Sequence, residues 1–202
     1  MDVFGEMERR YRQRDLPWDQ RLPPPEVMTL ASTVRPGRAL DLGCGVGRAS
    51  IYLAQRGWHC DGVDFVPEAV AMARIRAEES GVADSARFHT GSVTQLDMLE
   101  PPYDLAIDVG CLHNLRGDDL AAYAAGVARL VRPAGDLLLF AHLAGPDADI
   151  SEHGILEQLI YDTLEPDFIT KRVEHGTTTV NDQIWPSAWL WLRRAPLPLP
   201  WA

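Results

Sequence analysis

The sequence predicts a doubly wound α/β fold whose mostly parallel sheet ends in an antiparallel C-terminal hairpin. From residue 38 onward, short apolar segments alternate with amphipathic segments, and turn residues separate them. Strands that alternate with helices form βαβ units, in which helices cover both faces of a parallel sheet. The last two apolar segments have no helix between them, so we expect them to pair as a hairpin. The five earlier strands and this hairpin make a seven-stranded sheet.

Each element has its own pattern. Pro25 and Pro67 stand where a helix begins, because proline lacks the N–H that a first helical turn leaves unused. Gly81 and Pro133 then mark the ends of two helices. The expected helices cover residues 3–14, 46–56, 67–80, 118–131 and 151–164, with another from Pro25. The expected strands are residues 38–42, 59–64, 86–90, 103–110 and 135–142, then 168–176 and 187–194 in the hairpin.

Length and composition indicate one globular domain. The 202 residues suit a single domain, and no linker divides them. The longest apolar run, LLLFA at 137–141, is far shorter than the ~20 residues that span a bilayer. The charged N-terminus is no secretory signal, and three cysteines favour no disulfide framework. We therefore expect a cytoplasmic protein that does not bind membranes.

The net charge of −10 argues against a nucleic-acid partner, because proteins that grip phosphates carry basic patches. The six histidines are scattered, without a pair at the spacing of metal ligands, so we expect no metal site. A small-molecule partner remains the expectation. The oligomeric state cannot be inferred from these features.

The segment ALDLGCGVGRAS, residues 39–50, carries most of the functional signal. Three glycines occupy five positions directly after an apolar run that ends in Asp41. A dinucleotide-binding loop reads G-x-G-x-x-G, but here Arg48 takes the place of the third glycine. Asp64 ends the second strand, 21 residues after Gly43, where a carboxylate can accept ribose hydroxyls. A carboxylate at a strand end is expected outside the core. The alternative is a tight turn without a ligand.

Residues 39–74, ALDLGCGVGRASIYLAQRGWHCDGVDFVPEAVAMAR, resemble the class I methyltransferases that use S-adenosylmethionine (SAM). The similarity extends over roughly residues 15–194 and implies a Rossmann-like fold with SAM as cofactor. It implies a SAM-binding methyltransferase domain over residues 35–202. Residues 1–34 carry Trp18 and the Pro-rich hinge LPPPEV before this core, and we expect them to form an N-terminal helical lid, with a permanently docked helix as the alternative.

The resemblance also implies roles for the residues after the first two strands. The loop of Gly43, Cys44 and Gly45, which follows Asp41, lies against the methionine part of the cofactor in this family. The acid that ends the second strand holds the ribose, and the next residue packs on the adenine. These positions are Asp64 and Phe65 here, followed by the later cofactor-binding positions Ser92, Val93, Asp108, Val109 and Gly110.

These later positions follow the third and fourth strands. The family often has an Asp that reaches the adenine amino group where this chain has Ser92, a weaker acceptor. Val93 can still cover the adenine ring. Asp108, Val109 and Gly110 belong to IDVGCLHNL and correspond to positions beside the methionine end of the cofactor.

Within the class, the chain resembles the small-molecule branch of thiopurine and halide/thiol methyltransferases. LPWDQRLPPPEV before the core, DVGCLHNL and SAWLWLRR carry this likeness. In that branch the tryptophan of the N-terminal segment lies over the cofactor, which points to Trp18. The Asn-Pro-Pro-Tyr motif of nucleic-acid amino methyltransferases is absent. The expected function is methyl transfer from SAM to a small molecule at O, S or N.

Two histidines follow strands at the edge where the methyl group is expected. His113 follows the fourth strand and could act as a general base or orient a substrate hydroxyl. His142 ends the fifth strand and is a second candidate for substrate binding. The alternative for both is a histidine that hydrogen-bonds loop backbone.

Other chemistry-bearing residues have simpler interpretations. Without a paired base, Cys44 and Cys111 are expected to be small buried hydrophobes. Trp185, Trp189 and Trp191 are expected to pack the final hairpin, with an aromatic wall for a planar substrate as the alternative. Two other functions remain open: a non-catalytic SAM- or nucleotide-binding module, and an NAD-dependent oxidoreductase. Arg48 and the closing hairpin oppose the second of these.

Overall fold

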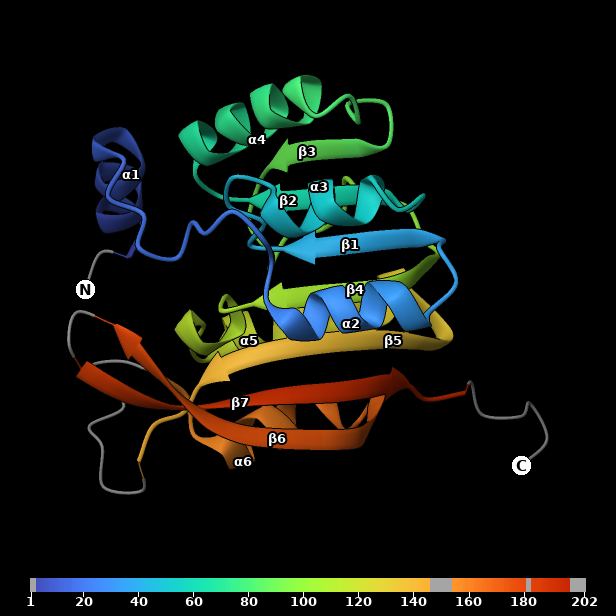
Figure 1. The fold of residues 1–202 in the computed structure, drawn as a ribbon. Helices are drawn as coiled ribbons and strands as arrows, with labels where there is room; N and C mark the ends of the chain where they lie inside the picture. Colours follow the sequence, from blue (N-terminus) through green and yellow to red (C-terminus); the bar gives the residue numbers. More distant parts are fainter. Residues whose placement is uncertain (1–2, 146–153, 181–182, 197–202) are drawn as a thin grey trace. The chain divides into compact units, whose positions relative to one another are not determined.

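The computed structural model describes residues 3–145, 154–180 and 183–196 (Figure 1). The chain folds as two compact units, Met1–Leu96 and Asp97–Ala202. The N-terminal segment, residues 1–34, belongs to the first unit. None of the helices in the described ranges is long and apolar enough to cross a membrane.

The first unit is a parallel sheet with helices packed on it. Strand β2 (His59–Asp64) lies between β1 (Arg38–Leu42) and β3 (Ala86–Thr90) and pairs with both in parallel. Helix α3 (Arg48–Ala54) packs on β1 and β2, and α4 (Pro67–Glu79) packs on β2 and β3. All three strands match the expected boundaries. Two further helices precede β1: α1 (Val3–Gln13) and α2 (Pro25–Thr33).

Helix α3 begins two residues later than the sequence indicates. Gly47, the residue before it, has a left-handed backbone with φ of 78°. A Cβ at this position would lie 2.6 Å from the ring of Phe88 and 3.1 Å from the Cβ of Ala73. Glycine therefore meets two requirements here, one on the backbone torsion and one on the space beside β3.

The N-terminal segment is held on α4 by ion pairs. Arg76 on α4 binds Asp19 through two hydrogen bonds of 2.9 and 2.6 Å. Arg12 on α1 donates to Glu68 at 2.9 Å. A two-bond Arg–carboxylate pair fixes orientation as well as distance, so it places the residues around Trp18.

The second unit contains the antiparallel hairpin. Strand β4 (Tyr103–Val109) pairs in parallel with β5 (Val131–His142). Strand β7 (Gln183–Arg194) lies between β5 and β6 (Phe168–Val180) and runs antiparallel to both. Helix α5 (Asp118–Leu130) packs on β5 and on α6 (Glu157–Leu164). The predicted α/β fold of seven strands, mostly parallel with a C-terminal hairpin, is confirmed.

Strand β5 begins earlier than expected, at residue 131 instead of 135. The helix before it ends at Leu130, and Val131 already has an extended backbone. Val131 pairs with Tyr103, and the register then shifts before Leu105. This irregularity accommodates Pro133, which cannot donate a ladder hydrogen bond. Proline therefore does not separate helix from strand as the sequence indicated.

The hairpin and the helix before it also differ from expectation. Strands β6 and β7 extend to Val180 and from Gln183, so the hairpin is longer than the two apolar segments. Helix α6 begins at Glu157, because residues 154–156 include a strand bridge at Ile155. Residues 151–153 of the expected helix lie outside the described residues.

Replacing Gly47 by alanine should destabilise the protein by more than the same change at Gly81. Both glycines have positive φ, 78° and 68°, so both changes carry the backbone cost of about 1–2 kcal/mol. Only Gly47→Ala also forces a methyl group into the Phe88 ring, for about a further 1–3 kcal/mol. Urea unfolding of both variants measures the difference. Equal losses would show that the Phe88 ring moves aside at no cost.

Candidate functional site

The glycine loop between β1 and α3 folds over the end of β2. Its glycines at 43, 45 and 47 all have positive φ, at 68°, 54° and 78°. The backbone N–H groups of Gly43 and Cys44 both donate to the carbonyl of Val63, at 2.9 and 3.0 Å. Glycine adopts such torsions without strain, so the loop can turn tightly against the strand.

The carboxylate of Asp64 fastens this loop. One oxygen accepts the N–H of Gly45 and the other accepts the N–H of Val66, each at 2.9 Å. Asp64 is 5% exposed, so the expectation that a strand-end carboxylate lies outside the core is wrong. Burial raises the pKa of Asp64, and the two backbone hydrogen bonds oppose that rise. Each oxygen keeps a second lone pair for a ligand hydroxyl.

Asp41, which lies in β1 before the glycine loop, bonds to the helix after the loop. It is buried in β1, and one of its oxygens accepts both the backbone N–H of Ser50, at 3.1 Å, and the Ser50 hydroxyl, at 2.7 Å. Burial raises the pKa of Asp41 to about 6, against the effect of these hydrogen bonds. Asp41 therefore ties β1 to the first turn of α3.

Tyr11 of α1 lies on the glycine loop. Its hydroxyl oxygen is 2.9 Å from the position that a Cβ of Gly45 would take. The Tyr11 hydroxyl therefore fills the space that a side chain at position 45 would need. Trp18 lies edge-on to Tyr11, with ring centroids 6.3 Å apart. Burial, together with the nearby charge of Asp64, raises the pKa of Tyr11. Arg10 lies 5.5 Å from the Trp18 ring.

The remaining candidates of the first unit follow β2 and β3. Phe65 is partly buried and packs against the apolar cluster around Tyr11. Ser92 bonds the hydroxyl of Thr94 at 2.7 Å and also accepts the Thr94 N–H at 3.2 Å. Val93 is buried. The Ser92 side chain thus shapes the turn after β3.

In the second unit, Asp108 fixes the loop after β4. It is fully buried, and its carboxylate accepts the N–H groups of Cys111 and Leu112 at 2.7 and 3.0 Å. The hydroxyl of Tyr123, on α5, also donates to it at 2.8 Å. No sequence motif indicated Tyr123. Its role follows only from the hydrogen bond that joins α5 to β4.

The residues at the end of β4 are less buried than those before them. Val109 and Gly110 are partly exposed, and Gly110 has φ of 95°. Cys111 is also only partly buried, so its prediction as a buried hydrophobe is wrong. Cys111 lies in the turn at the end of β4, and its backbone N–H is held by the Asp108 carboxylate. Cys44 is buried, which confirms its prediction.

The two candidate histidines stack on each other. The rings of His113 and His142 are 4.8 Å apart and inclined by 24°. The backbone N–H of His142 donates to Nδ1 of His113 at 3.3 Å. The neutral His113 ring therefore carries its proton on Nε2, from which it can donate but not accept. This tautomer fits the orienting role better than that of a general base.

Trp185 extends the histidine pair into a row of three rings. Its ring lies 6.2 Å from that of His142 and is inclined by only 19°. His142 Nε2 and the Thr178 hydroxyl are 2.9 Å apart, which fixes the middle ring of the row. The sequence did not link Trp185 to the histidines, because Trp185 on β7 lies far from both of them along the chain.

The other two tryptophans pack among their neighbours, as expected. Trp189 lies 5.0 Å from the Phe140 ring and 6.4 Å from Trp191. The guanidinium of Arg172 lies 4.6 Å from the Trp191 ring. Both tryptophans therefore cover the hairpin with partners from neighbouring strands.

Comparisons with known proteins point to a methyltransferase domain. Residues 39–135 match a protein family described as a methyltransferase domain. A ubiquinone biosynthesis O-methyltransferase of Xylella fastidiosa is 29% identical over 165 residues, covering 80% of this chain and 61% of the relative. A 2-heptyl-1-hydroxyquinolin-4(1H)-one methyltransferase of Mycobacteroides abscessus is 26% identical, covering 70% of this chain and 63% of the relative. The chain thus spans less than two thirds of the length of these relatives.

A solved structure extends the likeness to nearly the whole chain. The 1,6-didemethyltoxoflavin-N1-methyltransferase of Burkholderia thailandensis, determined with its substrate and S-adenosylhomocysteine, aligns with a TM-score of 0.73. It is 20% identical, and the alignment covers 96% of this chain and 87% of that one. At this identity the likeness is one of fold.

The Asp41 carboxyl should make folding less favourable as the pH rises from 4 to 7. Its pKa is about 6 in the folded protein against an ordinary value of 3.8, so the folded state binds its proton more tightly. Ionisation of Asp41 should leave the free energy of unfolding unchanged below pH 4 and lower it by roughly 2–3 kcal/mol above pH 6. Urea unfolding of the natural protein and Asp41→Asn at each pH isolates this contribution. If the free energies of unfolding of the two proteins differed by the same amount at every pH, the prediction would be wrong.

Proposed function

Because this chain carries a methyltransferase domain of the class I, SAM-dependent family, we propose that it transfers the methyl group of SAM to a small-molecule acceptor. The acceptor atom is an oxygen, a sulfur or a nitrogen. The observation that carries the proposal is the glycine loop, which is fastened at Gly45 to the carboxylate that ends β2. The family match favours this function over a nicotinamide enzyme or a binding module.

The residues of the first unit fit SAM. The positive-φ loop at residues 43–47 exposes backbone where the methionine part of SAM lies in this family. Asp64 has a lone pair left on each oxygen, which suits two ribose hydroxyls. Phe65 is partly buried beside it and can pack on the adenine, with Val93 as a second apolar contact. Asp41 supports the loop through Ser50, so its contribution is to position the loop.

The second unit supplies the other proposed contacts. Asp108 holds the loop that carries Val109 and Gly110, and these residues contact the methionine end of SAM through their backbone. His113 and His142 bind the acceptor, and His113 Nε2–H orients its nucleophilic atom. Bound SAM supplies a methyl group that is already electrophilic on a sulfonium. Positioning and exclusion of water can therefore carry much of the catalysis.

The relatives favour ring compounds as acceptors. Their names refer to ubiquinone biosynthesis, to a hydroxyquinolinone and to a didemethylated toxoflavin. The net charge of −10 makes a nucleic-acid acceptor unfavourable, since it repels phosphates. We therefore place the chain with methyltransferases of small molecules. The likeness to the thiopurine and halide/thiol branch remains a prediction.

We further propose that residues 1–34 act as a lid. In the described conformation Asp64 is 5% exposed, and Tyr11 of α1 lies on the glycine loop beside it. A ribose cannot reach the carboxylate unless this covering contact opens. The segment is held by the Asp19–Arg76 and Arg12–Glu68 pairs, both at least partly exposed to solvent, and by the packing of Tyr11 in an apolar cluster with Val66 and Ala69. Exposed ion pairs contribute about 0–1 kcal/mol each, so the apolar contacts around Tyr11 set most of the cost of opening.

Asp64→Asn should weaken the binding of S-adenosylhomocysteine about tenfold or more. The variant keeps one carbonyl oxygen for a backbone N–H, but it loses charge-assisted bonds to the ribose, worth about 1.5–3 kcal/mol each. Asp61→Asn is the matched control, because Asp61 lies on the same strand and pairs with Arg38 and His89 instead. Calorimetry measures both affinities, and circular dichroism checks the fold. Equal affinities would remove Asp64 from the site.

Hydrogen exchange tests the lid. Amides of residues 3–34 should exchange more slowly with S-adenosylhomocysteine bound, because the closed segment gains contacts with the ligand. The amides of α5 serve as an internal reference. Trp18→Ala should also lower the affinity for this ligand. Protection that is the same in both states, with unchanged affinity in the variant, would indicate a permanently docked helix.

A further inference from the structure

One short segment, Gly154–Ile155, is bonded to the parts of the chain that carry the two candidate histidines. His113 lies in the turn after β4, and His142 ends β5. The N–H of Ile155 donates to the carbonyl of His142 at 3.0 Å, and its carbonyl accepts the N–H of Ala144 at 2.9 Å. The backbone at His142 is therefore tied to this segment, which precedes α6.

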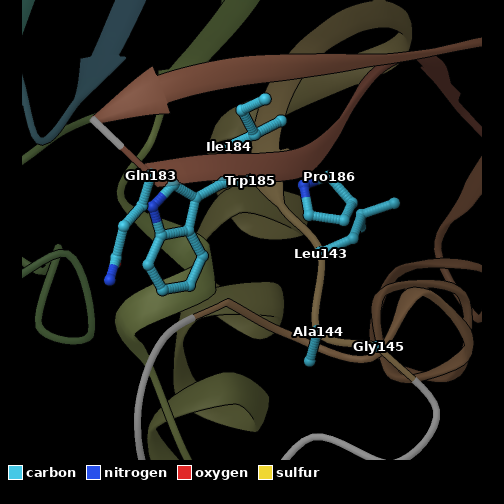
Figure 2. A pocket seen from close by; sticks show the side chains of 7 residues that line it. All are labelled: Leu143, Ala144, Gly145, Gln183, Ile184, Trp185 and Pro186. Carbon is cyan, nitrogen blue, oxygen red and sulfur yellow. The ribbon is translucent and has the colours of Figure 1, made fainter. Parts of the chain in front are cut away.

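Gly154 can approach the end of β5 because it has no side chain. Its φ is 87°, and a Cβ here would lie 2.9 Å from the carbonyl carbon of Leu143 and 3.1 Å from the carbonyl oxygen of His142. Glycine meets both requirements without strain. Leu143 also donates its N–H to the carbonyl of Pro186 at 2.8 Å, beside a cavity of about 410 Å³ that both residues line (Figure 2). The chain after His142 is thus held both by Gly154–Ile155 and by β7.

Arg116 joins the turn of His113 to the same segment. Its Nη1 donates to the carbonyls of His113 and Leu115, each at 2.7 Å, and its Nη2 donates to the carbonyl of Gly154 at 2.9 Å. A guanidinium can bind several carbonyls at once, because its N–H donors point outward from a rigid plane. The turn of His113 is therefore attached to the segment to which His142 is attached.

Arg116 also completes the turn itself. His113 is the middle residue of a 3₁₀ helix, Leu112–Asn114. A short helix leaves N–H groups at its start and carbonyls at its end to be paired by other groups. The Asp108 carboxylate accepts two N–H groups at the start, and Arg116 donates to carbonyls at the end. The peptide groups on both sides of His113 are thus fixed by charged side chains, whose signs match the backbone dipoles.

The position of the His113 ring depends on these attachments. The ring is buried, and its Nδ1 accepts the N–H of His142 at 3.3 Å. This distance is longer than most N–H···O bonds, so the bond alone is a weak link between the two histidines. The attachment of both backbones to Gly154–Ile155 keeps the donor and the acceptor nitrogen aligned.

From these contacts we propose that Arg116 is a positioning residue of the acceptor site, one that no sequence motif indicated. It holds the turn of His113 against Gly154 and thereby keeps Nδ1 of His113 on the N–H of His142. The proton of the neutral ring then stays on Nε2, from which it can donate to the acceptor. The inference rests on the proposed function, in which His113 orients the acceptor.

Arg116→Gln tests the proposal by NMR, because glutamine is uncharged and too short to replace the three bonds. Two signals report on the bond between the histidines: the ¹⁵N resonance of His113 Nδ1, and hydrogen exchange of the His142 amide. In the variant, the Nδ1 resonance should move towards that of a nitrogen without a donor. The His142 amide should exchange about tenfold faster relative to the amides of residues 137–139 in the middle of β5. An unchanged resonance and an unchanged ratio would overturn the proposal.

Arg194→Gln is the matched control. Arg194 also donates to two backbone carbonyls of the second unit, those of Ala128 and Asp167. A general loss of stability accelerates exchange of all amides of β5 together and leaves the Nδ1 resonance in place, which is the result expected for this control. Equal effects in both variants would overturn the proposal. Should Arg116→Gln not fold, Arg116→Lys, which keeps the charge but not the fork, decides by the same two signals.

Calorimetry of the natural protein with S-adenosylhomocysteine tests the proposed function separately. Binding of this ligand while Arg116→Gln leaves both NMR signals unchanged would refute only the positioning role. Changed NMR signals in a protein that does not bind the ligand would refute the proposed function and leave the attachment of His113 by Arg116 intact.

Discussion

The carboxylate of Asp64 accepts one backbone N–H from the glycine loop and another from the residue before α4, and the candidate cofactor site of the first unit depends on this pair of bonds. Through them the loop after β1 and the helix after β2 are fixed to one side chain. Gly45 can present its N–H to that carboxylate because it adopts a positive φ. The same bare backbone admits the Tyr11 hydroxyl.

Two other buried carboxylates near strand ends also accept hydrogen bonds from the residues that follow the strand. Asp41 in β1 accepts the N–H and hydroxyl of Ser50, and Asp108 in β4 accepts two loop N–H groups and the Tyr123 hydroxyl. Each carboxylate satisfies backbone donors that a turn beyond a strand would otherwise leave unpaired. Acids that the family resemblance suggests as cofactor ligands therefore also build the loops beside which we propose that the cofactor binds.

Burial of these carboxylates also changes their pKa values. Burial raises the pKa of Asp41 and of Asp64, because a low-dielectric surrounding disfavours the charged form. Hydrogen bonds from backbone N–H groups compensate part of that cost, and a ribose that donates to Asp64 would add to the compensation. If Asp64 binds the cofactor as proposed, cofactor binding and stability of the first unit are linked through the same carboxylate.

The sequence by itself determined the strands of the first unit, the glycine loop and the acids Asp41 and Asp64 on either side of it. These features are local: apolar periodicity, positive-φ glycines and turn residues act over a few positions, and all three strands of the first unit match their expected boundaries. Only the tertiary structure decided the burial of Asp64, the contact of Tyr11 with Gly45 and the row from His113 to Trp185. These depend on segments far apart in the chain. No local pattern encodes the packing angle that brings such segments together.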